Sequence, residues 1–281
     1  MSVKKKARTS RVSPELSIGV IQCALAEAPE INVARVIGHV REAAELGAKI
    51  ILTPELFQTP YFPRRQDEAY FAWAEPARGH KTIARFAKLA KELGVVLPFS
   101  FFERDGQHYY NSLAMIDANG KVLGIYRKTH VPEGPGYHEK YYFRAGDTPL
   151  EVWETRHGRL GVGVCWDQWF PEHARALTLK GAEILLYPTA IGSEPASGED
   201  TKDPWQRVMI GNAVANSIPV AAANRVGEEG ELTFYGSSFI CDPRGDKLQE
   251  LGRDQPGVLV HSFDRVALTK WCVFWGFFCD C

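Results

Sequence analysis

Residues 159–177, RLGVGVCWDQWFPEHARAL, are the most informative segment of the sequence for the fold. Small and apolar residues at 160–164 predict a buried strand, and Pro171 opens a helix that we expect to reach Lys180. Cys165 stands between them, an arrangement that resembles a nucleophile elbow, which lifts one side chain above a sheet. A helix N-terminus lowers the pKa of a thiol, so we expect a reactive Cys165. The alternative is a buried structural cysteine, because free cysteine is often fully buried.

Apolar runs alternate with amphipathic stretches along the rest of the chain. The sequence predicts strands at 16–23, 50–53, 95–102, 184–187, 219–223, 239–242 and 258–263, and helices at 32–46, 83–93 and 205–216. Asn119-Gly120 predicts a hairpin with a two-residue turn. Because neither a linker nor a repeat divides the chain, we expect a single α/β domain over residues 15–265 with its helices outside.

Composition excludes several classes of partner. Of 281 residues, 45% are hydrophobic and 24% are charged, and the net charge is −1, which gives no electrostatic case for nucleic acid or an anionic membrane. No stretch approaches the apolar length that spans a bilayer. The basic start (Lys4, Lys5, Lys6, Arg8 and Arg11) is not followed by an apolar region, so we expect a disordered tail at 1–14 and a cytoplasmic protein.

The six cysteines form no C-x-x-C pair, so the sequence gives little support for a zinc site or a thioredoxin-like redox motif. A thiol nucleophile usually works with a histidine, but the histidines show no papain-type spacing. Two other charged residues instead follow predicted strands, where ligands of α/β folds gather. Glu55 closes the apolar run of KIILTPELFQTPYF (49–62), and Lys128 follows the second strand of the hairpin in GKVLGIYRKTHVPEGPGYHEKYYF (120–143). Each alone could be an ordinary solvent-facing residue.

Together, Glu55, Lys128 and Cys165 offer a base, an electrostatic support and a nucleophile. These three blocks, in this order and spacing, resemble the carbon–nitrogen hydrolase (nitrilase) superfamily over nearly the whole chain. The resemblance implies a single-domain, four-layer αββα sandwich. It implies Glu55 as general base, Lys128 as stabiliser of the tetrahedral intermediate and Cys165 as nucleophile.

The resemblance also implies a second glutamate near the lysine. Glu139 matches this position better than Glu133 does, and the backbone N–H of Trp166 would complete the oxyanion hole. No metal or organic cofactor is implied.

The stretches TPELFQTPYF, HVPEGPGYHEKYYF, CWDQWFPE and LLYPTAIGSEP are most similar to those of members that act on N-carbamoylputrescine. Relatives with anionic substrates place Arg just after the nucleophile, whereas here no cation precedes His173. Glu194, on the long irregular stretch 191–204, is where the resemblance puts a carboxylate for the distal ammonium, although it could also be a solvated loop residue. We expect a pocket wall formed by Tyr61, Trp166, Thr189 and Ala190.

Alternatives remain open at this stage. Within the superfamily these are an ω-amidase, an aliphatic amidase or a ureidopropionase-like hydrolase, and outside it a catalytically silent scaffold. Residues 266–281 combine aromatic residues with Cys272, Cys279 and Cys281, which marks an interface-prone C-terminal segment. Family members assemble, so a homodimer or larger homo-oligomer is expected.

Overall fold

The structure is a computed structural model that describes residues 13–277. The basic start and the two last cysteines, Cys279 and Cys281, lie outside the described residues, so the predicted disorder of the tail is not tested there. Within residues 13–277, no helix has the length and apolar character that crossing a bilayer requires.

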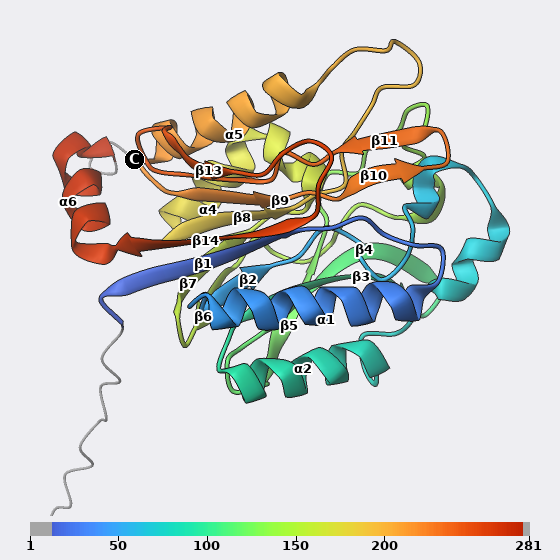
Figure 1. The fold of residues 1–281 in the computed structure, drawn as a ribbon, viewed down its shortest axis with the longest axis horizontal. Helices are drawn as coiled ribbons and strands as arrows, with labels where there is room; N and C mark the ends of the chain where they lie inside the picture. Colours follow the sequence, from blue (N-terminus) through green and yellow to red (C-terminus); the bar gives the residue numbers. More distant parts are fainter. Residues whose placement is uncertain (1–12, 278–281) are drawn as a thin grey trace, which may run out of the picture.

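Two sheets lie face to face between two layers of helices (Figure 1). The first sheet has two three-stranded parts: β14 (Gly257–Asp264), β1 (Glu15–Gln22) and β2 (Ile50–Leu52), then β3 (Leu97–Asp105), β4 (His108–Ile116) and β5 (Val122–Arg127). A parallel bridge between Ile50 and Val96 joins them. The second sheet runs in the order β13 (Lys247–Glu250), β12 (Phe239–Cys241), β9 (Val220–Ala223), β8 (Ile184–Pro188), β7 (Gly158–Val162), β6 (Val152–Thr155).

The outer layers are two pairs of helices. Helices α1 (Pro29–Glu45) and α2 (Lys81–Leu93) cover the first sheet, and α4 (Pro171–Leu179) and α5 (Lys202–Asn216) cover the second (Figure 1). This is the four-layer αββα sandwich that the resemblance implied, and the prediction is confirmed. The remaining elements are the one-turn α3 (Glu139–Tyr142), the hairpin β10 (Val226–Glu229) and β11 (Leu232–Tyr235), α6 (Arg265–Trp275), and the 3-10 helices η1 (Phe62–Arg64), η2 (Glu68–Trp73) and η3 (Cys165–Trp169).

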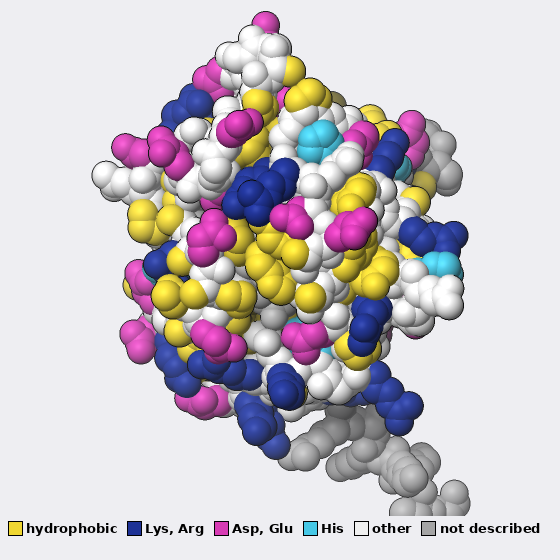
Figure 2. All heavy atoms as spheres, turned by 90° about the vertical axis from the view of Figure 1, so that its right-hand side faces the viewer, with side chains coloured by type: hydrophobic (Ala, Val, Ile, Leu, Met, Phe, Trp, Pro, Cys, Tyr) yellow, Lys and Arg dark blue, Asp and Glu magenta, His cyan; other side chains and the backbone are white. Residues whose placement is uncertain are grey.

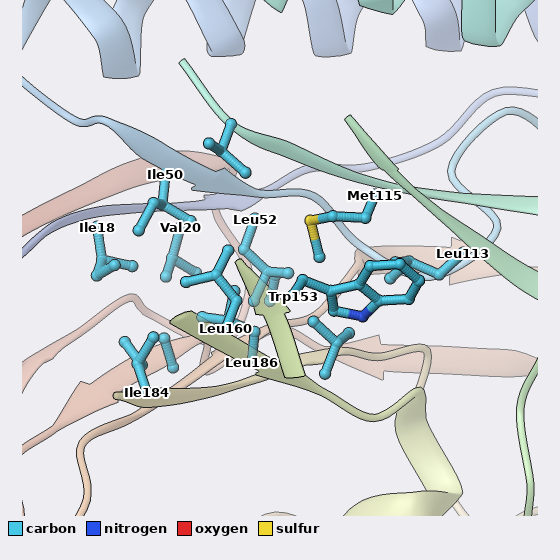
Figure 3. Packing of buried hydrophobic residues seen from close by; sticks show 14 of the residues in the cluster. Ile18, Val20, Ile50, Leu52, Leu113, Met115, Trp153, Leu160, Ile184 and Leu186 are labelled. Carbon is cyan, nitrogen blue, oxygen red and sulfur yellow. The ribbon is translucent and has the colours of Figure 1, made fainter. Parts of the chain in front are cut away.

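The main core fills the space between the two sheets. Ile18 of β1 and Leu52 of β2 face Ile184 and Leu186 of β8 across this layer (Figure 3). The intervening Leu185 points the other way, against α4 and α5. Because both faces of these strands are buried, they are continuous apolar runs in the sequence rather than alternating ones.

The predicted hairpin forms, but the prediction of a two-residue turn is wrong. The Gly120 N–H bonds to the Asp117 carbonyl, and the Asp117 N–H bonds to the Lys121 carbonyl, so three residues lie between the closing pair. Gly120 alone takes the left-handed conformation, with φ of 82°. A three-residue loop with glycine at its left-handed position is the next most common hairpin connection.

Helix α6 was not predicted from the sequence. It leaves the end of β14 and stands at the left edge of the molecule in Figure 1. None of its residues is buried, and the side chains of Val273 and Phe274 are 73% and 72% exposed. The described part of the segment predicted to be interface-prone therefore carries an uncovered apolar surface in a single chain.

Candidate active site

The site lies where the parallel strands of both sheets end. Glu55 follows β2, Cys165 follows β7 and Thr189 follows β8. The two sheets meet here, because the Glu55 N–H donates to the Thr189 carbonyl and Cys23 forms a parallel bridge with Arg225. Figure 2 shows the end of the molecule drawn on the right in Figure 1, where apolar side chains gather with acidic and basic side chains around them.

A buried charge cluster forms the centre of the site. Lys128 Nζ donates to Glu55 Oε1 at 2.9 Å and to Glu139 Oε2 at 2.7 Å, and all three side chains are fully buried. Asn111 donates to Glu55 Oε1 at 2.6 Å, and the Tyr61 hydroxyl donates to Glu139 Oε1 at 2.7 Å. Among the described residues, Glu55 Oε2 has no hydrogen-bond partner, so this oxygen is available to take a proton.

Charge coupling sets the protonation of the cluster. Burial lowers the pKa of Lys128, but attraction to Glu139 and Glu55 outweighs burial, and the net pKa lies above its usual value. The lysine therefore stays charged. Burial raises the pKa of Glu139 to about 7, against the opposing attraction of Lys128. The single ammonium of Lys128 thus forms ion pairs with two carboxylates, and none of the three side chains is exposed to water.

Cys165 sits on a strained turn. Its φ is 42°, in the left-handed region that favours glycine, and the 3-10 helix η3 (Cys165–Trp169) begins at this residue. The thiol lies 3.8 Å from the Ala190 carbonyl. Burial, and next the charge of Glu55, raise the pKa of the thiol well above its usual value. The expected lowering by a helix N-terminus is therefore wrong for the free enzyme, because burial and the carboxylate outweigh it.

A pocket opens beside the thiol. Its lining residues are Tyr61, Pro132, Glu133, Gly134, Pro135, Tyr137, Glu139, Cys165, Trp166, Ala190, Ile191 and Glu194. No lysine, arginine or histidine is among these described lining residues. Four of the expected substrate contacts lie there: Tyr61, Trp166, Ala190 and Glu194.

Thr189 does not line the pocket, contrary to the prediction. Its side chain is fully buried, and its hydroxyl donates to Gln168 Oε1 and to the Tyr187 carbonyl. Successive residues of an extended chain point to opposite sides, so Ala190 faces the pocket while Thr189 faces away.

Sequence reasoning missed several residues of the site. The Tyr137 hydroxyl donates to the Ser193 carbonyl and accepts from the Gly192 N–H, which ties two pocket walls together. Tyr137 lies two residues before Glu139 in the segment 120–143, so it could have been predicted as a residue of the site from its position. Asn111 lies within β4 and carried no signal, because its role depends on a partner 56 positions away.

Glu194 is half-buried on the loop after β8. Burial raises the pKa of its carboxyl group. The side chain thus brings a partly desolvated carboxylate to a pocket wall that lacks a cation. Within the described chain, no cluster of three or more His, Cys, Asp or Glu residues is arranged to hold a metal ion.

A four-layer sandwich that holds a thiol beside a buried glutamate–lysine pair defines a class of hydrolases that cleave carbon–nitrogen bonds through a cysteine. The chain belongs to the carbon–nitrogen hydrolase family, whose model matches residues 17–272. It is an amidohydrolase of this family.

Similar proteins agree with this assignment. The chain is 50% identical to an N-carbamoylputrescine amidase of Arabidopsis thaliana, over 95% of the chain and 92% of the relative. It is 48% identical to a citrullinase of Francisella tularensis, over 94% of each. Among solved structures, a carbon–nitrogen hydrolase from Helicobacter pylori G27 superposes with a TM-score of 0.89 at 33% identity, over 95% of each chain.

Proposed function

We propose that this enzyme hydrolyses the carbamoyl group of N-carbamoylputrescine to putrescine, ammonia and carbon dioxide. The observation that carries the proposal is the charge of the pocket beside Cys165. Three carboxylates line it and, among the described residues, no cation does. Lys128 offsets the charge of Glu139, and Glu133 accepts from His138 and the Lys140 N–H. Glu194 is left to meet an ammonium group.

The relatives support the same substrate and suggest one alternative. N-carbamoylputrescine amidases of four plants are 47–50% identical to the chain. The citrullinase is about as similar, and citrulline carries both an ammonium and a carboxylate at the end distant from its carbamoyl group. The ammonium could meet Glu194, but the carboxylate would find no cation among the described lining residues, so the geometry favours the diamine.

The first half-reaction begins with a protonated thiol. Glu55 Oε2 takes the proton from Cys165 Sγ as the sulfur attacks the carbamoyl carbon. The carbonyl oxygen becomes an oxyanion, which the charged Lys128 and the N–H of Trp166, in the first turn of η3, stabilise. Glu55 then returns the proton to the departing nitrogen as the carbon–nitrogen bond breaks, leaving an acyl group on the sulfur.

The second half-reaction uses water. Glu55 takes a proton from a water molecule whose oxygen attacks the acyl carbon, and the carbon–sulfur bond breaks as the thiol regains its proton. The carbamate or carbamic acid released decomposes to carbon dioxide and the second amine. Glu139, fixed by Tyr61, holds the Lys128 ammonium in place through both halves.

A substrate panel tests the proposal. Purified enzyme is assayed for ammonia release from N-carbamoylputrescine, citrulline, N-carbamoyl-β-alanine, and simple aliphatic and ω-amides. We expect the highest kcat/KM with N-carbamoylputrescine. A higher value with citrulline or another amide would replace the proposed substrate, and no ammonia from any of them would support a silent scaffold.

Assembly and compartment complete the proposal. We expect a homodimer or larger homo-oligomer, because Val266, Val273, Phe274 and Trp275 of α6 are exposed apolar side chains. A single-chain mass in light scattering would refute it. A cytoplasmic location fits a catalytic thiol that must stay reduced. Cell fractionation checks this location.

A further inference from the structure

A second buried polar cluster lies directly behind the nucleophile, and the mechanism above does not use it. Its centre is Asp167, which is fully buried in η3. One carboxylate oxygen, Oδ1, accepts from the N–H of His130 at 2.9 Å and lies 2.8 Å from Nδ1 of the same residue. The other, Oδ2, accepts from the Tyr126 hydroxyl and from the Val164 N–H, both at 2.8 Å.

These contacts join two segments that are far apart in the sequence. Tyr126 and His130 flank Lys128 by two residues on either side. Val164 directly precedes Cys165 and Asp167 follows it by two. Asp167 is therefore bound to both sides of the residue that carries the catalytic ammonium and to the backbone beside the catalytic thiol.

The residues around Asp167 are tightly packed and hold its contacts in place. The His130 ring stacks on Phe170 with centroids 3.6 Å apart and planes 7° apart. A Cβ added to Gly163 would lie 3.0 Å from the Asp167 Cβ and 2.6 Å from His173 Cε1, so the strand before Cys165 lies tight against the cluster. Burial raises the pKa of Asp167, but the hydrogen bonds and nearby histidines outweigh burial, and the net pKa is lowered. The carboxylate is therefore charged, and charged acceptors make the stronger hydrogen bonds.

We propose that Asp167 is a positioning residue that fixes Cys165 against Lys128 and Glu55 by binding the two segments to each other. It does not line the pocket, so it acts through its neighbours and not on the substrate. The left-handed backbone of Cys165 needs such support, because a strained conformation persists only where its surroundings hold it. The proposal rests on the catalytic roles given above to Cys165 and Lys128.

The test is Asp167→Asn in the full chain. The asparagine side chain has the same shape as aspartate, but one of its two oxygens is replaced by an NH2 group. That NH2 group would face the N–H of either Val164 or His130, each of which needs an acceptor. We expect kcat with N-carbamoylputrescine to fall about a hundredfold, the effect of a displacement near 1 Å, with KM unchanged to within about threefold. Alkylation of Cys165 by iodoacetamide, which needs no substrate, should slow by about tenfold, consistent with a poorly placed proton acceptor.

Two further variants provide a second test of the Asp167 contacts and a control. Tyr126→Phe removes one bond to Asp167, together with the contacts of the same hydroxyl with Thr129 and His173, and changes the shape little. It should lower kcat by about tenfold and serves if the first variant does not fold. Asp242→Asn is the matched control, because Asp242 also accepts two backbone N–H groups, in the turn between β12 and β13. It should leave kcat and alkylation unchanged.

The outcomes separate this inference from the proposed function. If Asp167→Asn and Tyr126→Phe lower the melting temperature while kcat and the alkylation rate stay at wild-type values, Asp167 is structural only and the inference fails. If the wild type is alkylated quickly and the variant slowly, but neither acts on N-carbamoylputrescine, the inference stands and the proposed substrate fails.

Discussion

Replacing Glu194 by Gln removes one charge from the pocket and keeps the size of the side chain. Two unit charges 4 Å apart attract by about 4 kcal/mol at an effective dielectric constant of 20. Desolvation of both groups offsets part of this, and the half-buried position of Glu194 puts the net loss near the lower end of the range for buried pairs, about 2 kcal/mol. We therefore expect kcat/KM for N-carbamoylputrescine to fall about thirtyfold.

The assay compares N-carbamoylputrescine with N-pentylurea, in which a methyl group replaces the distal ammonium. The loss should be confined to the charged substrate. Glu199→Gln is the matched control, because Glu199 is an exposed carboxylate on the same loop and does not line the pocket. This substitution should change kcat/KM for either substrate by no more than the equivalent of about 0.5 kcal/mol. Equal losses on both substrates, or none on either, would refute the assigned role of Glu194.

The pH dependence tests the same contact. Burial raises the pKa of Glu194, so its carboxylate takes a proton at a higher pH than an exposed glutamate does. The charge that binds the ammonium is present above that raised pKa and is lost as the pH falls through it. KM for N-carbamoylputrescine should therefore rise in this acid range, whereas KM for N-pentylurea stays flat. The rise should be absent from Glu194→Gln, and its persistence there would assign it to another group.

Four further substitutions test the centre of the site. Cys165→Ala should abolish turnover and leave the circular dichroism spectrum unchanged; more than trace activity would rule out the nucleophile. Glu55→Gln should slow kcat by about 10²–10⁴-fold, and a near-normal rate would exclude it as the base. Lys128→Met should lower activity and also cost about 3–5 kcal/mol in urea unfolding, because two buried carboxylates lose their shared cation. Gly163→Ala should cost about 1–3 kcal/mol in the same assay, since its Cβ would lie 2.6 Å from His173 Cε1; an unchanged midpoint would contradict this packing.

The main strands and helices, and the three central residues of the candidate site, could be predicted from the sequence. The predicted strands and helices form, because burial on both faces requires long apolar runs and the helices carry one apolar stripe each. Elements with weak patterns were missed: β13 is a mostly exposed edge strand, and α6 buries no residue. Glu55, Lys128 and Cys165 could be found because each follows a strand, and strand ends of an α/β fold meet at one edge.

Which groups meet, and in which protonation state, depends on tertiary contacts. Lys128 reaches Glu55 across 73 positions and Tyr61 reaches Glu139 across 78, contacts that local periodicity cannot encode. The raised pKa of the Cys165 thiol likewise depends on burial by distant residues, which overrides the local effect of the helix end. The bond from the Val164 N–H to Asp167 is local, but the contacts of Asp167 with Tyr126 and His130 join segments about 40 positions apart and depend on the packing of the two sheets. Propensity and patterning act over a few residues, whereas desolvation and hydrogen-bond partners are set by the packing of the whole chain.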